Sequence, residues 1–377
     1  MKITILGAGT VGAIIARDLA GQSDLEVTAC DANPARLTPL KSHQIETRKI
    51  DLARADAIEE SVKDADIVVG ALPGFLGFKM LKTLIELGKR IVDVSFMPEN
   101  PLSLNDMAQK HGVSVVVDMG VAPGMSNFLV GHAVSELESV EEIKIYVGGL
   151  PVDRKLPFQY KAPFSPIDVI EEYTRPARYV DYGHIHTVPA LSDVELIDFP
   201  GIGTLEAFFT DGLRTLLYTV KVPHMVEKTM RYPGHAALIS TLKSIGFFND
   251  GLVDAGEVKA RPIDLTSTLL LDCWRIEPED REFTAMRVII RGSQGGQKRQ
   301  YSYELVDFKD EATGNTSMAR TTGFPCAVAT RLMADDLITT SGIIVPEILG
   351  QNPDIFTKVM EALKDRGIRI TETITDL

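Results

Sequence analysis

The sequence has little cysteine, a deficit of basic charge and no long hydrophobic run, and each shortage excludes a class of protein. Its three cysteines, Cys30, Cys273 and Cys326, lie far apart without a C-x-x-C pair, so we expect no metal site built on them. Lysine and arginine together number 39 against 52 acidic residues, which argues against a nucleic-acid partner. No apolar stretch approaches the ~20 residues of a membrane span, so we expect no membrane partner either.

The amino-terminal segment does not resemble a secretory signal. Met1 and Lys2 precede only four strand-like residues before Gly7, whereas a signal needs roughly 7 to 15 apolar residues. We therefore expect a cytoplasmic protein. The chain has 377 residues, more than one compact core usually holds, and this length favours two domains.

The first twenty residues predict a nucleotide site. Residues 2–6 form a β-branched run typical of a buried strand, and GAGTVG follows at residues 7–12. In this G-x-G-x-x-G pattern the first glycine permits a tight turn, the second lets the backbone approach a pyrophosphate, and the third allows close helix packing. The N-terminus of the following helix then faces the diphosphate. The cofactor-binding residues expected in this loop are Gly7, Gly9, Thr10, Val11 and Gly12.

The choice of cofactor depends on the end of the second predicted strand, residues 26–30. Asp31 follows it, about twenty residues beyond the glycine loop, where a carboxylate accepts both ribose hydroxyls of NAD. The same carboxylate repels the 2′-phosphate of NADP. Arg36 lies close enough in sequence to reduce this discrimination against NADP. The alternative is that it is a solvated helix residue. We predict NAD, with NADP as the alternative.

The loops after the later strands supply further cofactor-binding candidates. Strand-like runs at residues 65–69 and 90–95 extend the sheet, and the loops at the carboxyl ends of such strands line the ligand crevice. Position alone therefore favours Ala71, Leu72, Pro73, Asp93 and Ser95.

The middle of the chain has a different pattern, with strands joined by longer irregular links rich in proline and glycine. We predict an α/β fold in which residues 1–126 form a Rossmann domain with a doubly wound parallel sheet. Residues 127–318 form a second, α+β domain with a mixed sheet, and residues 319–377 return to the Rossmann domain. The mixed sheet is also a candidate interface for a homodimer or higher homo-oligomer.

Several separated stretches resemble one family. DMGVAPGMSN at residues 118–127 resembles the Gly-Pro-Gly signature of saccharopine dehydrogenase-like enzymes. Later stretches are similar to the lysine 6-dehydrogenases of that family: YVGGLP at 146–151, LEAF at 205–208, DGLRTL at 211–216, RYPGH at 231–235 and MARTT at 318–322. The resemblance implies that NAD takes a hydride from the ε-carbon of L-lysine, water attacks the imine and ammonia leaves. Relatives that reduce imines imply the alternative, a saccharopine- or carboxynorspermidine-type reductase that condenses an amine with an aldehyde or keto acid.

Such chemistry needs a carboxylate anchor and a group that moves protons. Arg214, in the loop-like DGLR, is the first choice for the anchor because guanidinium holds a carboxylate with two hydrogen bonds, and Arg231 competes with it. Asp118, which follows a predicted strand, and His235 are the catalytic candidates, with Glu206 weaker. Each has a structural alternative: an ion pair for the arginines and Glu206, a helix cap for Asp118, and a satisfied hydrogen-bonding role for His235.

Two further points bear on the function. His184 and His186 share one face of a predicted strand, but no third ligand follows at matched spacing, so we predict no metal. A condensing reductase would need more than one basic anchor in the cleft, and Arg214 and Arg231 both lying there would favour it. A third hypothesis is a non-catalytic NAD-sensing protein, because a Rossmann fold does not fix function.

Overall fold

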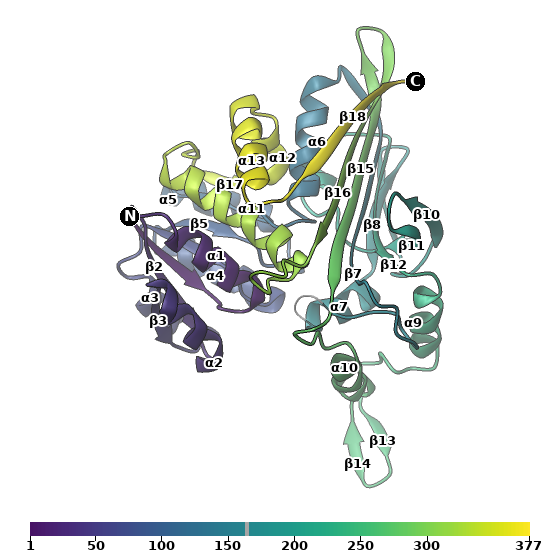
Figure 1. The fold of residues 1–377 in the computed structure, drawn as a ribbon, viewed down its shortest axis with the longest axis horizontal. Coiled ribbons are helices and arrows are strands. Elements are labelled where there is room, and N and C mark those ends of the chain that lie inside the picture. The colour runs from purple at the N-terminus through teal and green to yellow at the C-terminus, as the bar shows by residue number, and fades with distance from the viewer. Residues whose placement is uncertain (163–165) are drawn as a thin grey trace.

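The computed structural model describes residues 1–162 and 166–377. They contain two large sheets, each with its own helices (Figure 1). The first sheet runs in the order β17-β6-β5-β4-β1-β2-β3, and all its neighbouring strands are parallel. Its strands are β1 (Lys2–Leu6), β2 (Glu26–Asp31), β3 (Glu46–Lys49), β4 (Ile67–Gly70), β5 (Arg90–Asp93), β6 (Ser114–Val116) and β17 (Gly342–Ile344). The order from β3 to β6 is that of a doubly wound Rossmann sheet, which confirms the predicted class.

Helices cover both faces of this sheet. Ile3 and Ile5 of β1 pack on one side with α1 (Thr10–Ala20) and α11 (Ser317–Ala334). Val68 and Ile91 point to the other side, because side chains alternate along a strand. That side is covered by α3 (Ala55–Val62), α4 (Gly74–Glu86) and α5 (Asn105–His111). The remaining short helices of this domain are α2 (Pro34–Leu37), η1 (Thr38–His43) and η2 (Pro101–Leu104). Burial on both faces explains why the central strand β4 is apolar throughout, whereas the edge strand β3 is polar.

The second sheet is mixed, as predicted, with the order β10-β11-β12-β7-β15-β16-β18. β12 and β7 are parallel, the other neighbours along this path are antiparallel, and β8 and β9 extend the sheet from β12. Its strands are β7 (Ser139–Pro151), β8 (Ala177–Asp181), β9 (His184–Val188), β10 (Glu195–Phe199), β11 (Gly203–Phe209), β12 (His224–Arg231), β15 (Glu282–Gln294), β16 (Gln297–Phe308) and β18 (Ile370–Asp376). Gly295 and Gly296 form the tight β15–β16 turn with φ of 60° and 78°, a conformation that glycine adopts without strain.

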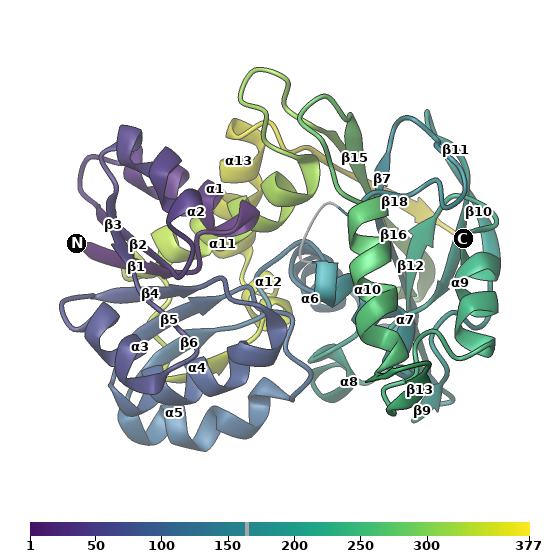
Figure 2. The same ribbon diagram turned by 90° about the horizontal axis from the view of Figure 1, so that it is seen from below.

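The carboxyl-terminal segment does not simply return to the Rossmann domain. α11 packs on α1 and β17 pairs with β6, but β18 then crosses to the second sheet and pairs with β16 along its length. β18 thereby pairs one edge of β16 that would otherwise carry open backbone hydrogen-bonding groups. α12 (Pro346–Gly350) and α13 (Pro353–Asp365) connect the two parts. Figure 2 shows α12 and α6 (Met125–Glu136) between the two sheets.

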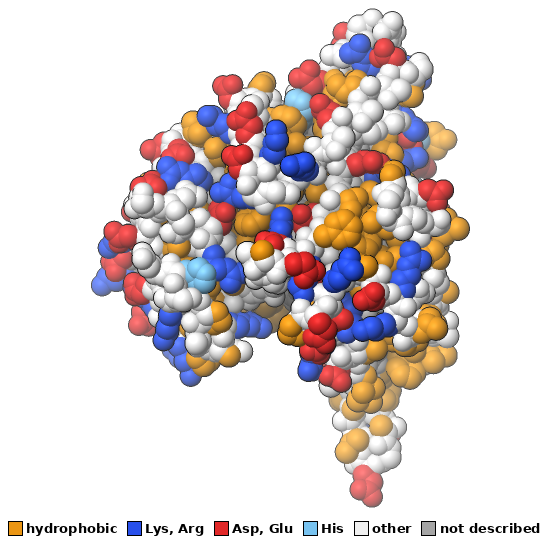
Figure 3. Space-filling model, in the orientation of Figure 1, with side chains coloured by type: hydrophobic (Ala, Val, Ile, Leu, Met, Phe, Trp, Pro, Cys, Tyr) orange, Lys and Arg blue, Asp and Glu red, His pale blue; other side chains and the backbone are white. Residues whose placement is uncertain are grey.

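The second domain carries its other helices at one end. They are α7 (Pro166–Thr174), α8 (Leu216–Thr219), α9 (His235–Ser244) and α10 (Pro262–Cys273), and β13 (Val253–Ala255) and β14 (Val258–Ala260) form a separate hairpin. Among the described residues, none of the helices combines the length and the apolar character that crossing a bilayer requires. Figure 3 shows that the surface is hollowed between the two domains.

Candidate active site

The glycine loop has the steric requirements that its motif predicts. Gly7 has a φ of +104°, and a Cβ there would lie 2.3 Å from the carbonyl oxygen of Ala71. A Cβ on Gly12 would lie 2.0 Å from the carbonyl oxygen of Gly7. A Cβ on Gly9, in contrast, would meet no described atom within 4 Å. Two glycines are therefore required by packing, and the middle one leaves the open space that a diphosphate needs at the start of α1.

Asp31 is fixed beside this loop at the end of β2. The backbone N–H of Ala8 donates to its Oδ2 at 2.8 Å, and that of Asn33 donates to its Oδ1 at 2.7 Å. The guanidinium of Arg36 lies 3.6 Å from Oδ2 and is mostly exposed. A carboxylate and an exposed cation thus face the same end of the cavity, and they favour opposite dinucleotides.

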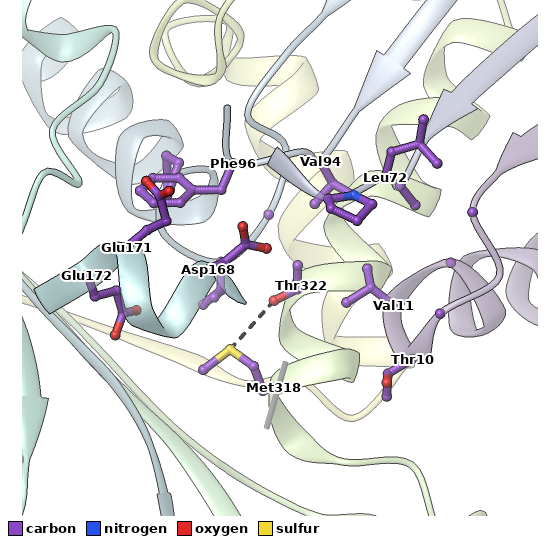
Figure 4. Close-up of a pocket in the computed structure, with 18 of the residues that line it drawn as sticks. Thr10, Val11, Leu72, Val94, Phe96, Asp168, Glu171, Glu172, Met318 and Thr322 are labelled. Atoms are coloured by element: carbon purple, nitrogen blue, oxygen red, sulfur yellow. Dashed lines mark hydrogen bonds between the residues drawn. The ribbon is translucent and has the colours of Figure 1, made fainter. Parts of the chain in front are cut away.

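One cavity of about 450 Å³ joins the glycine loop to the second domain (Figure 4). The structure places most of the predicted cofactor residues in its lining: Gly7, Gly9, Thr10, Val11, Gly12, Asp31, Ala71, Leu72 and Pro73. Opposite them, the second domain contributes residues of β7, α7 and β12 and the loop after β11. Met318 and Thr322 of α11 lie between the two groups (Figure 4). A ligand on the glycine loop therefore extends toward side chains of the second domain.

Asp93 and Ser95 lie behind the lining rather than in it. The Ser95 hydroxyl donates to Asp93 Oδ1 at 2.8 Å, both side chains are buried, and burial raises the pKa of Asp93 to about 8. Val94 and Phe96 line the cavity instead. The correction follows from the alternation of side chains in extended backbone, because choosing a segment by position does not say which alternate residues face the ligand.

Asp118 and Arg214 bind each other. The guanidinium of Arg214 donates from Nε and Nη2 to the two carboxylate oxygens of Asp118, at 3.2 and 3.0 Å, and both side chains are buried. Nη1 donates to the carbonyl oxygens of Met97 and Glu99. The pair therefore joins the two domains behind the cavity. This geometry argues against the predicted roles of Asp118 as a base and Arg214 as an anchor, because a bidentate ion pair occupies both.

His235 and Glu206 are also used by the structure of the second domain. His235 Nε2 lies 2.9 Å from the hydroxyl of Tyr173 and Nδ1 lies 3.0 Å from the carbonyl oxygen of Phe158, while burial lowers the pKa of His235 to about 3. Glu206 accepts from the backbone N–H groups of Gly234 and Ala236, which caps the start of α9. Neither side chain is in the cavity lining. The structural alternative holds for His235, whereas Glu206 is a helix cap rather than the predicted ion-pair partner.

Arg231 is the predicted substrate residue that does line the cavity. Its Nη2 donates to Glu172 at 2.5 Å and to the hydroxyl of Tyr160 at 3.3 Å, and Nη1 donates to the carbonyl oxygen of Met230. Its Nε is buried and has no acceptor among the described residues. Such an unpaired donor in a cavity wall is costly unless a ligand accepts from it, so Arg231 is a candidate carboxylate anchor.

Glu227 of β12 is a cavity residue that the sequence did not suggest. Its Oε2 accepts from the hydroxyl of Thr210 at 2.7 Å and from the backbone N–H of Gly212 at 3.0 Å. A Cβ on Gly212 would lie 2.4 Å from the Glu227 carboxyl carbon, so glycine makes this approach possible. Burial raises the pKa of Glu227 to about 8. A carboxyl group with this pKa exchanges a proton near neutral pH, which suits a general acid or base.

One face of α7 adds further charge to the same wall. Asp168, Glu171, Glu172 and Arg175 follow at i, i+3, i+4 and i+7, and all four line the cavity. Figure 4 shows Asp168 directed from α7 toward the middle of the cavity. The Arg175 guanidinium is bonded to Glu171 at 2.7 Å and lies 4.8 Å from the ring centroid of Phe96. This periodic pattern of charge was visible in the sequence and could have located the site.

The wall of the second domain is rich in carboxyl groups. It presents five carboxyl groups and two guanidinium groups: Asp168, Glu171, Glu172, Asp211 and Glu227, with Arg175 and Arg231. Each guanidinium is bonded to one of the carboxylates, and burial raises the pKa of Glu172. Asp211 is held by Arg178, and Glu227, with its pKa of about 8, is mostly protonated at neutral pH. The wall therefore offers carboxyl oxygens as acceptors for ammonium groups rather than a large negative charge.

Two family models match the chain. The saccharopine dehydrogenase NADP binding domain matches residues 3–116, and the saccharopine dehydrogenase C-terminal domain matches residues 120–368. The saccharopine dehydrogenase [NADP(+), L-glutamate-forming] of Saccharomyces cerevisiae is 22% identical over 446 residues, covering 98% of both chains. The carboxyaminopropylagmatine dehydrogenase of Synechocystis is 20% identical, covering 93% of this chain and 94% of its own.

A mammalian relative is longer. The mitochondrial alpha-aminoadipic semialdehyde synthase of Rattus norvegicus is 22% identical over 97% of this chain but over 47% of its own length, so the chain spans about half of that relative. A solved structure of the yeast saccharopine dehydrogenase without ligand has the same fold, with a TM-score of 0.81, 20% identity and 99% coverage of both chains.

The fold, the glycine loop and these matches together define the class of the protein, a two-domain chain whose first domain has the fold and the glycine loop of a dinucleotide-binding domain. The chain belongs to the saccharopine dehydrogenase family. This confirms the resemblance found in the sequence and leaves its dinucleotide and its particular substrate to be proposed.

Proposed function

We propose that the protein catalyses the NAD-dependent oxidative deamination of L-lysine at its ε-carbon. The observation that carries the proposal is the single cavity that joins the glycine loop to a wall rich in carboxyl groups that contains Glu227. Lysine fits that wall because it brings two ammonium groups and one carboxylate. The carboxyl acceptors of the wall support an amine as the substrate. Each guanidinium of the wall is already bonded to a carboxylate, which disfavours a condensed product with several carboxylates.

The dinucleotide fits the first domain, because Gly9 leaves open space at the start of α1 and Asp31 stands at the ribose position. When bound, NAD supplies the acceptor for the hydride. The backbone N–H groups at the start of α1 would hold the diphosphate, and Asp31 would accept the ribose hydroxyls. We assign NAD over NADP because Asp31 is fixed by two backbone hydrogen bonds, whereas Arg36 is largely exposed.

The second domain would position the amine. The unpaired Nε of Arg231 binds the α-carboxylate, and the α7 carboxylates attract the ammonium groups. Glu227 removes a proton from the ε-ammonium, which frees the lone pair that assists departure of a hydride from C6. Glu227 releases that proton to solvent and then accepts a proton from the water that adds to the protonated imine. It passes this proton to the nitrogen, and as the C–N bond breaks the hydroxyl proton leaves with ammonia as ammonium. The reaction consumes lysine, NAD and water and yields the semialdehyde, NADH, ammonium and one proton.

A condensing reductase is the second candidate, and Arg175 is the observation that favours it. Its Nη1 is a buried donor with no acceptor among the described residues, and a second carboxylate would satisfy it. A condensing reductase was expected to have both Arg214 and Arg231 free in the cleft. This condition is not met, because Arg214 is bonded to Asp118. Arg175 itself is bonded to Glu171, which weakens it as an anchor.

One assay separates these functions. NADH absorbance and ammonia would be followed after the purified protein is mixed with NAD and either lysine, ornithine or 1,5-diaminopentane. NADH and ammonia in equal amounts with lysine support the proposal. If lysine alone gives neither NADH nor ammonia, but NADH is oxidised when lysine and a keto acid are supplied together, the protein is the condensing reductase. Dinucleotide binding without turnover in either direction leaves the sensing protein.

A further inference from the structure

A line of hydrogen bonds continues from the carboxyl group of Glu227 along the wall of the second domain. The hydroxyl oxygen of Thr210 lies 2.7 Å from Glu227 Oε2 and 2.8 Å from the hydroxyl oxygen of Thr229. All three side chains line the cavity, and none is more than 4% exposed. We call the two hydroxyl groups, of Thr210 and Thr229, the hydroxyl chain.

The sheet brings these three side chains together. Glu227 and Thr229 are two residues apart on β12, so their side chains project from the same face of the strand. Thr210 follows Phe209, the last residue of β11, which pairs with the residue between them. The backbone N–H of Gly212 donates to the same Oε2 at 3.0 Å and holds the carboxyl group against the hydroxyl chain. Strand pairing and a backbone hydrogen bond therefore fix the arrangement.

The protonation state of Glu227 sets the direction of each hydrogen bond in the hydroxyl chain, because a hydroxyl group has one proton to donate. When Glu227 is ionised, Oε2 only accepts, so Thr210 donates to it and Thr229 donates to Thr210. The Thr229 oxygen then offers lone pairs to the cavity. When Oε2 carries a proton, it donates to Thr210, and Thr210 donates to Thr229. Thr229 is then left with a proton that it donates into the cavity.

We propose that Thr229 and Thr210 form a proton relay through which Glu227 exchanges its proton with the contents of the cavity. A donor in the cavity gives a proton to the Thr229 oxygen, Thr229 gives its own proton to Thr210, and Thr210 gives its own proton to Oε2 of Glu227. One N–H or O–H bond of the donor breaks, one O–H bond forms on Glu227, and each threonine again carries one proton. The reverse passage returns the proton to the cavity.

The relay also gives Thr229 a place in the reaction. The ε-ammonium of lysine is the first donor to Thr229, and the water that adds to the imine is the second. This second step rests on the proposed function. The relay itself does not, because water in the cavity exchanges protons with Glu227 by the same path.

A light-triggered drop in pH across the Glu227 pKa of about 8 tests the relay on the full chain without a substrate. Time-resolved infrared spectroscopy follows the carbonyl stretch of the protonated carboxyl group, and the absence of this band in Glu227→Gln assigns it. Thr229→Val removes the outer hydroxyl group but leaves Thr210 to donate to Glu227. The pKa should therefore stay near 8, while the protonation rate falls by about 100-fold, the low end of what a proton-transfer group contributes. Thr229→Ser keeps a hydroxyl group and should restore the rate.

The matched control is Thr204→Val on β11. The Thr204 hydroxyl also donates to a carboxylate, Asp198, at 2.7 Å, but it lies outside the cavity lining, so the rate should not change. Thr210→Val should slow protonation and also raise the pKa of Glu227, because the hydrogen bond from Thr210 favours the ionised form. An unchanged rate in Thr229→Val, or a slow rate that Thr229→Ser does not restore, would overturn the relay.

Lysine oxidation tests the second step. In Thr229→Val, kcat should fall by about 100-fold while KM for lysine and the affinity for NAD stay unchanged, and Thr229→Ser should recover most of the loss. An unchanged kcat would mean that the ammonium reaches Glu227 without Thr229. If the unmodified protein does not oxidise lysine at all, the infrared measurement still decides the relay, so the two failures are distinguishable.

Discussion

The two ends of the cavity are built in different ways. The nucleotide end depends on residues close in sequence, with the glycine loop and Asp31 within the first two strands. The amine end takes its charged side chains from α7, the loop after β11, and β12. Backbone geometry shapes the first end, and ionisable side chains held by burial and ion pairs shape the second. We expect substitutions at the amine end to change the chemistry, and those at the nucleotide end to change only cofactor binding.

The largest effect should come from Glu227→Gln. Loss of a general base typically costs about 10² to 10⁴ in rate, so kcat for lysine oxidation should fall by that factor while NAD affinity is unchanged. In the unmodified protein, oxidation should accelerate as pH rises through about 8, because Glu227 acts as a base only when deprotonated. This rise in rate near pH 8, the alkaline limb of the pH–rate profile, should be absent in the variant.

Glu206→Gln is the matched control, since Glu206 is a buried glutamate that caps α9 outside the cavity. It should lower the melting temperature and keep the pH–rate limb. If the limb near pH 8 persists in Glu227→Gln, the proton-transfer role of Glu227 is wrong.

The second-largest effect is on the free energy of unfolding. It tests whether Asp118 and Arg214 stabilise the fold rather than act on a ligand at either end of the cavity. Asp118→Asn should destabilise the fold by about 3 to 5 kcal/mol, because it leaves the buried Arg214 charge without its partner. Urea unfolding measures this, and the double variant Asp118→Asn/Arg214→Met should recover part of the loss. A stable Asp118→Asn protein with abolished turnover would instead restore Asp118 as a catalytic residue.

The third effect is at the carboxylate anchor. Arg231→Lys keeps the charge but removes the Nε donor, so kcat/KM for lysine should fall about 10- to 100-fold, the equivalent of a charged hydrogen bond. The control is the substrate 1,5-diaminopentane, which lacks the carboxylate and should lose much less. Equal losses with both amines would mean that Arg231 supports Glu172 rather than the substrate.

The fourth effect belongs to the nucleotide end. Asp31→Ser should weaken NAD about tenfold and reduce the preference over NADP, because Arg36 then stands beside a neutral residue. The maximal rate with saturating NAD should change little. Isothermal titration with each dinucleotide measures the preference, and unchanged NAD affinity would remove Asp31 from the ribose site.

The smallest effect on activity should come from His235→Gln, because His235 lies outside the cavity lining and stays neutral at neutral pH. The pKa of His235 is lowered to about 3 in the folded protein, so its contribution to stability is present above about pH 6.5 and is lost as pH falls toward 3. The free energy of unfolding of the variant should therefore fall less steeply as the pH is lowered. A large fall in kcat at neutral pH would return His235 to the catalytic candidates.

The sequence predicted the nucleotide end better than the amine end for a physical reason. The glycine loop is a local motif whose steric needs can be derived residue by residue, and its geometry follows that derivation at Gly7 and Gly12. Asp118 was predicted to be catalytic because it follows a predicted strand, and His235 because imidazole titrates near neutral pH, with Glu206 as a weaker candidate. In the folded chain each meets a partner distant in sequence, which spacing does not reveal. The helical repeat of charge that begins at Asp168 was the available signal.

The central claim is that hydride leaves the ε-carbon of lysine and reaches the dinucleotide across one cavity. The most direct test uses lysine deuterated at C6, with NAD as the oxidant and mass spectrometry of the reduced dinucleotide as the readout. The NADH formed should carry one deuterium, and lysine deuterated at the α-carbon should give unlabelled NADH. Label arriving from the α-carbon, or no reduced dinucleotide with either substrate, would contradict this claim.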